Sequence, residues 1–197
     1  MKLKKWETAL IAALSLTLLG GAALAGEQSE LSDKIIRLHV VANSDSPKDQ
    51  ATKLEARDRV LAIVEPLLDG SRDADDAAKL VASNLSAIEE AAKSAAPDGA
   101  AVRAELTSEY FPTREYETFS LPAGRYTSLR VTLGQGGGRN WWCVVFPPLC
   151  APEHGENLDG LLSDGEVALI TEESAGFVVK FKAIELIGNI RKWLGAD

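Results

Sequence analysis

The chain has 197 residues, of which 46% are hydrophobic and 25% charged, and its 21 Lys and Arg against 29 Asp and Glu give a net charge of −8. These values are typical of globular proteins and exclude a disordered, collagen-like or multi-span membrane chain. The acidic excess argues against a nucleic-acid partner, because binding to phosphates depends on many Lys and Arg side chains.

The first 25 residues have the layout of a secretory signal peptide. Basic residues precede an apolar run over residues 9–19, and the small residues Ala23 and Ala25 form a cleavage site. An uncleaved anchor is the alternative, because the 18 residues after Thr8 are nearly uncharged. In either case the sequence predicts one exported domain over residues 26–197, with membrane contact only through the signal segment or a partner.

The first predicted element of this domain is a strand over residues 35–42, with one apolar face and one mixed face that carries His39. A lone histidine on such a face is usually a hydrogen-bonded structural residue. Asn43, Ser44 and Asp45 follow at the strand's end, where loops often carry functional side chains. On physical grounds alone, we expect Asn43 and Asp45 only to shape an Asx-type turn ahead of a helix, and a functional contact is the alternative.

Two amphipathic helices are predicted next. The first begins at Ser46, Pro47 and Asp49, which occupy the N-cap, N1 and N3 positions in a pattern close to a capping box, and it ends near residue 68. The second spans about residues 73–95. Acidic residues in its first turn complement the helix dipole, and they lack the spaced oxygen ligands and turn glycine of a calcium loop.

The pattern then changes to strands, which predicts a single-domain α+β fold. Alternating residues indicate a mainly antiparallel sheet, followed by a last strand that leads into a C-terminal helix. The predicted strands cover residues 102–107, 113–119, 125–133, 141–146 and 176–181.

A glycine cluster at residues 134–138 resembles a phosphate-binding loop in composition only. Phosphate-binding motifs require a helix directly after the glycines, whereas strand-like residues 141–144 follow here. The cluster therefore predicts a flexible connection between two strands.

Cys143 and Cys150 are the only two cysteines. Export allows them to form a disulfide, and Pro147-Pro148 between them provides a turn, but the strict geometry of a disulfide cannot be derived from spacing. Two alternatives stay open. One is a zinc site completed by His39 and His154, whose spacing matches no compact zinc motif, and the other is a Cys–His nucleophilic pair.

Trp141 and Trp142 lie side by side in a predicted strand, so their side chains point to opposite faces. One of them therefore lies under another element or is exposed. An exposed tryptophan is a candidate contact anchor, because Trp, Tyr and Arg dominate binding hot spots. Packing of both side chains in the core is the alternative. The sequence contains no Gly-x-Ser-x-Gly elbow and no carboxylate pair at glycosidase-like positions, so we expect neither catalysis nor a cofactor.

Several long motifs resemble the stage II sporulation protein R family of endospore-forming bacteria. They cover residues 36–46, 111–116, 122–131 and 138–150, with shorter matches at 49–50, 57–58 and 180–185. The tail at residues 187–197 extends beyond the usual end of the family.

The resemblance implies a signalling protein made in the forespore and secreted across the forespore membrane into the intermembrane space. There it would activate a membrane-embedded aspartic peptidase that processes the mother-cell sigma-E precursor. The resemblance supplies no catalytic residues, and we expect no metal. Two other function classes stay open: a secreted cysteine-dependent hydrolase and a cell-envelope ligand-binding module. The expected contact residues for the peptidase are His39, Asn43, Ser44, Asp45, Trp141 and Trp142.

Overall fold

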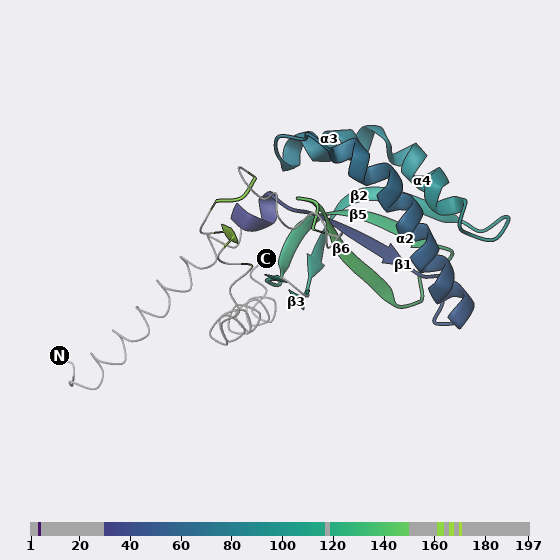
Figure 1. Cartoon of the computed structure of the whole chain (residues 1–197). Helices are drawn as coiled ribbons and strands as arrows, with labels where there is room; N and C mark the ends of the chain where they lie inside the picture. Colours follow the sequence, from purple (N-terminus) through teal and green to yellow (C-terminus); the bar gives the residue numbers. More distant parts are fainter. Residues whose placement is uncertain are drawn as a thin grey trace.

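The computed structural model describes residue 4, residues 30–116 and 119–149, and residues 161–163, 166–167 and 170 (Figure 1). Apart from residue 4, the predicted signal peptide with Ala23 and Ala25 lies outside these residues, as do the strand at 176–181 and the C-terminal helix. Within the described part of the chain, no helix is both long enough and apolar enough to span a membrane.

Four strands form a mixed sheet in the order β2-β5-β1-β6. The interior strand β1 (Ile36–Val41) pairs parallel with β5 (Gly124–Leu133) and antiparallel with β6 (Asn140–Phe146). At the other edge, β2 (Val102–Phe111) pairs antiparallel with β5. The pairings are mostly antiparallel, which confirms the predicted α+β class.

Strand β1 is buried on both faces. Ile36, Leu38 and Val40 face a core on the helix side of the sheet, whereas Arg37 and His39 lie on the other face. The mixed face is therefore not a solvent-facing surface. An interior strand that is covered from both sides buries every residue, whatever its polarity.

Three helices cover one face of the sheet (Figure 1). Helix α2 (Pro47–Leu68) begins as predicted, with the Ser46 hydroxyl accepting a hydrogen bond from the Asp49 amide at 3.1 Å. The prediction of one second helix is wrong, because α3 (Ala74–Ser83) and α4 (Leu85–Lys93) are separate. The chain turns at Asn84, whose side chain donates to the Leu80 carbonyl at 2.8 Å and so competes with the helical backbone bonds.

The far face of the sheet carries a second hydrophobic core. A small hairpin, β3 (Arg114–Glu115) and β4 (Ser120–Leu121), replaces the single strand predicted over residues 113–119. The chain reverses where the Tyr116 amide donates to the Phe119 carbonyl at 2.8 Å. The buried members of this core are Leu31, Ile35, Phe111, Phe119, Leu121, Tyr126, Val144, Leu162 and Ile170.

Candidate functional site

A cluster of three polar and charged side chains lies on the far face of the sheet, and each comes from a different strand. His39 comes from β1, Arg130 from its neighbour β5, and Glu109 from the edge strand β2. His39 Nδ1 lies 3.0 Å from Glu109 Oε2, and Arg130 Nη1 donates to Glu109 Oε1 at 2.7 Å. One carboxylate therefore binds two basic side chains and links the three strands.

The surroundings of Glu109 lower its pKa from the ordinary 4.5. Burial acts in the opposite direction, but contacts with Ser128 and His39 and the charges of His39 and Arg130 outweigh it. Glu109 is therefore ionised at neutral pH, and this cluster depends on its negative charge.

Arg37 is the largest fully buried side chain of the described residues. Its Nη2 donates to the Tyr116 hydroxyl at 2.8 Å, and its guanidinium carbon lies 4.0 Å from the ring centre of Phe111 and 5.1 Å from that of Tyr126. Its Nε and Nη1 atoms have no hydrogen-bond partner in the described part of the structure. Burial lowers the pKa of Arg37, although the tyrosines oppose this effect. Among the described residues, aromatic faces and one hydroxyl thus stabilise this charge, and no carboxylate pairs with it.

His39 and Trp142 lie close together on the same face. Their ring centres are 5.8 Å apart, and each ring also packs near Phe111. The Arg114 guanidinium lies 4.9 Å from the Trp142 ring centre. His39 Nε2 and Trp142 Nε1 are buried and have no hydrogen-bond partner among the described residues. The structure therefore brings together two of the predicted contact residues, with His39 almost fully covered.

Trp141 lies on the opposite, helix-covered face. It packs against the first core, and the guanidinium of Arg57 from α2 lies 4.8 Å from its ring centre. Both tryptophans are half-buried, because each face of the sheet has its own core. Both tryptophans therefore pack against a core, which is the alternative that the sequence left open.

Asn43, Ser44 and Asp45 lie at the carboxyl end of β1 and attach the β5–β6 loop to it. The Asn43 side-chain oxygen accepts from the Gln135 amide at 3.0 Å, and an Asp45 carboxylate oxygen accepts from the Arg139 amide at 2.7 Å. Asn43 and Asp45 are exposed, yet their polar atoms form these internal bonds. Asn43 and Asp45 therefore have a structural role, but their bonds reach the distant β5–β6 loop, which is a longer-range contact than the Asx-type turn expected from the sequence.

The glycine cluster fits this attachment. A Cβ at Gly134, whose φ is +58°, would lie 2.1 Å from the Asn43 side-chain oxygen, and a Cβ at Gly138 would lie 2.3 Å from the Ser44 carbonyl oxygen. Glycine allows the loop to approach the strand end at these positions. The predicted connection between two strands is confirmed, but hydrogen bonds hold it in place, so it is not a free linker.

Cys143 is buried and forms a disulfide bond. The other cysteine of the sequence, Cys150, and His154 lie outside the described residues, so the Cys143–Cys150 pairing stays a prediction. The zinc alternative is disfavoured, because it needs Cys143 as a thiolate ligand. No group of three or more His, Cys, Asp or Glu side chains suited to a metal occurs in the described part of the chain.

Three residues that shape this site are not among the candidates expected from the sequence: Arg37, Glu109 and Arg130. Glu109 and Phe111 are two positions apart in β2, so both side chains lie on the face that carries the second core. An acidic residue two positions before an aromatic residue in a predicted strand is the signal that could have indicated Glu109. Its partner His39 is 70 positions away, and that contact depends on the strand order.

Comparison with known proteins gives one family. The sequence model of Stage II sporulation protein R matches residues 32–156, which include all six predicted contact residues. A curated relative, Stage II sporulation protein R of Bacillus subtilis (strain 168), is 37% identical over 123 residues, covering 61% of this chain and 55% of the relative. The match thus spans about half the length of that relative. No solved structure matches the chain.

Proposed function

The chain belongs to the stage II sporulation protein R family, and from this membership we propose that it is an exported signalling protein that activates a membrane-embedded aspartic peptidase. Its role in sporulation follows from the family. Activation of the peptidase, and the resulting processing of the mother-cell sigma-E precursor, are the proposed part. The family match over residues 32–156 is the observation on which the proposal rests.

Activation without chemistry requires that the chain bind one state of the peptidase more tightly than the other. The described domain suits such a role, because two cores support the sheet and two hydrogen bonds anchor the β5–β6 loop to the end of β1. A pre-ordered surface loses little conformational entropy on binding.

The competing hydrolase hypothesis needs a reactive cysteine and a histidine that can take its proton. Cys143 is in a disulfide, so it has no thiolate to act as a nucleophile. His39 Nδ1 is bound to Glu109, and its Nε2 is buried. These observations favour a binding protein over a cysteine-dependent enzyme.

The exposed contact surface that we propose is the carboxyl end of β1. Asn43 and Asp45 are exposed there, held by the loop at residues 134–139. The half-buried side chain of Trp142 lies on the far face and belongs to the proposed surface. His39 is buried and packs against the Trp142 ring, so its proposed role is to hold that ring in position.

Co-expression of the chain with the peptidase and the sigma-E precursor in a non-sporulating host tests this proposal. We expect precursor cleavage only when the chain is present and exported. Cleavage that is independent of the chain would overturn the proposed function.

Alanine variants of Asn43, Asp45 and Trp142 test the surface in the same assay, with circular dichroism to verify folding. Ser86→Ala, an exposed change on α4, is the matched control. Folded variants that retain full processing would show that the partner binds elsewhere.

Secretion into the intermembrane space is also a proposal. It is supported by the signal-like layout of residues 1–25 and by the family. A fusion of alkaline phosphatase to the carboxyl end of the chain should be active in a host that exports it, and inactive when residues 1–25 are deleted.

A further inference from the structure

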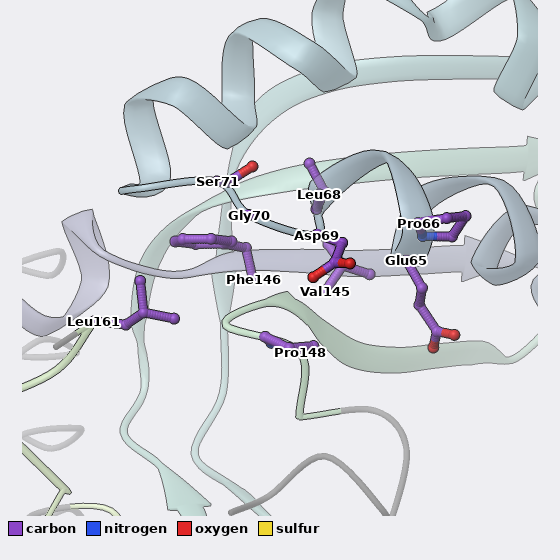
Figure 2. A pocket seen from close by; sticks show the side chains of 10 residues that line it. All are labelled: Glu65, Pro66, Leu68, Asp69, Gly70, Ser71, Val145, Phe146, Pro148 and Leu161. Atoms are coloured by element: carbon purple, nitrogen blue, oxygen red, sulfur yellow. The ribbon is translucent and has the colours of Figure 1, made fainter. Parts of the chain in front are cut away.

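A cavity of about 440 Å³ opens where α2 and β6 end (Figure 2). Its walls come from the last turn of α2 and the turn after it, from the end of β6 and from Leu161. The volume is within the range of about 300–1,000 Å³ found for ligand pockets. None of the residues discussed above as contact residues lines it.

Among the described residues that line this cavity, the charged ones are Glu65 and Asp69, and both are acidic. They lie at the carboxyl end of a 22-residue helix, where the helix dipole is negative, and α2 has no basic residue in its last turn. Neither carboxylate forms an ion pair with another described residue. Negative charge is therefore concentrated where a cation is most favourable.

The remaining lining is mainly apolar. Leu68, Phe146 and Leu161 supply hydrocarbon surface, and Figure 2 shows these side chains around the opening together with Pro148. The Ser71 hydroxyl also lines the cavity, is buried, and has no hydrogen-bond partner within the described residues. The cavity thus offers apolar contact, one hydrogen-bonding hydroxyl and two carboxylates.

We propose that this cavity receives a Lys or Arg side chain, with an adjacent apolar residue, from an extended segment of a protein partner. The long stem of a basic residue packs on apolar surface while its charged end reaches a carboxylate. Two carboxylates alone do not supply the six to eight oxygens that a calcium ion takes. The inference rests on the proposed function only in taking the occupant to be a protein.

A small probe tests the cavity without any knowledge of the partner. The probe is the blocked tripeptide acetyl-Leu-Arg-Leu-amide, and its control replaces Arg with citrulline, which keeps the shape and removes the charge. Each is titrated into the isotope-labelled protein recovered after export by a host, and amide shifts are followed by NMR. We expect saturable shifts at Leu68–Ser71 and Val145–Phe146, with binding about tenfold weaker for citrulline, a difference of about 1.4 kcal/mol.

Variants in the same titration link the effect to the two carboxylates. The double variant Glu65→Gln/Asp69→Asn should bind the arginine probe only as tightly as the native chain binds the citrulline probe. Asp75→Asn, an exposed acidic position on α3, should leave it unchanged. Equal binding of the two probes, or shifts confined to other parts of the molecule, would overturn the inference.

The processing assay separates this inference from the proposed function. We expect the Glu65→Gln/Asp69→Asn variant to reduce processing, with Asp75→Asn as the control. Chain-dependent processing that this variant leaves intact overturns the cavity inference alone, whereas processing that never needs the chain overturns the proposed function alone. Dimerisation in sedimentation experiments that the same variant abolishes would identify a second copy as the occupant and also overturn the inference.

Discussion

Glu109 on the edge strand β2 contacts His39 on the interior strand β1 across the intervening β5, with a distance of 3.0 Å between Oε2 and Nδ1. Its other carboxylate oxygen accepts from Arg130 of β5 at 2.7 Å. The side chains of Glu109 and His39 are only 16% and 11% exposed, so water competes weakly for these bonds. This contact joins three strands of the sheet by side chains as well as by the backbone.

Replacing Glu109 with Gln should therefore destabilise the fold. The amide keeps the shape but leaves Arg130 and His39 without an anionic partner, and we expect a loss of about 1 to 3 kcal/mol in the free energy of unfolding. Urea denaturation followed by tryptophan fluorescence measures it. Glu105→Gln is the control, because Glu105 is on the same strand and pairs with Arg103 at an exposed site, where the loss should stay below about 0.5 kcal/mol. Equal losses in the two variants would contradict a special role for Glu109.

The same carboxylate predicts the pH dependence of stability. The folded pKa of Glu109 is lower than its ordinary value of 4.5, so the stabilisation is fully present above 4.5 and is lost as the pH falls through the folded pKa. The difference in stability between the native chain and Glu109→Gln should be present at neutral pH and shrink as the pH falls below 4.5. Urea titrations at a series of pH values test this, and a difference that grows on acidification would show that the sign is wrong.

Local signals in the sequence predict much of the fold. The start of α2 depends on Ser46 and Asp49, which are three positions apart, and the strands β1, β5 and β6 have regular β-type patterns. The break at Asn84 depends on a competition between its side chain and the helical backbone, which residue periodicity does not reveal. The burial of Arg37 could not be predicted because the elements that cover it lie far along the chain.

Arg37 provides a test of whether a buried charge serves stability. Two of its nitrogens have no partner among the described residues, so Arg37→Met removes a desolvated charge while retaining most of the side-chain volume. We expect thermal unfolding to show unchanged or higher stability, whereas Arg37→Ala should cost about 2 to 5 kcal/mol through the cavity that it leaves. A loss above about 2 kcal/mol for Arg37→Met would show that its contacts with Phe111, Tyr116 and Tyr126 outweigh the cost of burial.

The close approach of the glycine loop to Asn43 leads to a paired comparison. Gly134→Ala places a Cβ against the Asn43 side chain, so it should cost about 2 to 4 kcal/mol through backbone strain and broken hydrogen bonds. Gly99 has a similar positive φ of +78° but nothing within 4 Å of the added atom, so Gly99→Ala should cost only about 1 to 2 kcal/mol. Chemical denaturation compares the free energies of unfolding of the two variants. Equal losses would indicate that the loop shifts to accommodate the added Cβ at residue 134.

The candidate site was only partly predictable for the same physical reason. His39 and Trp142 are 103 positions apart in the numbering yet lie in contact, because β1 and β6 are neighbours in the sheet. A sequence pattern identifies residues of the right type, but the strand order decides which of them meet. The same holds for Asn43 and Asp45, whose side-chain oxygens accept from the amides of Gln135 and Arg139, more than 90 positions away, and not only from their own neighbourhood as an Asx-type turn would require.

The state of Cys143 leads to a prediction about both stability and function. Because Cys143 is in a disulfide and Cys150 is the other cysteine, thiol labelling of the unfolded chain should modify no cysteine before reduction and two afterwards. Cys143→Ser should lower the free energy of unfolding by about 2 kcal/mol, as expected for a short closed loop, and should release one labelled thiol. Precursor processing should persist in the folded variant, since the proposed function assigns no chemical step to the sulfur. Loss of processing in a Cys143→Ser variant that is still folded would instead favour the cysteine-dependent enzyme.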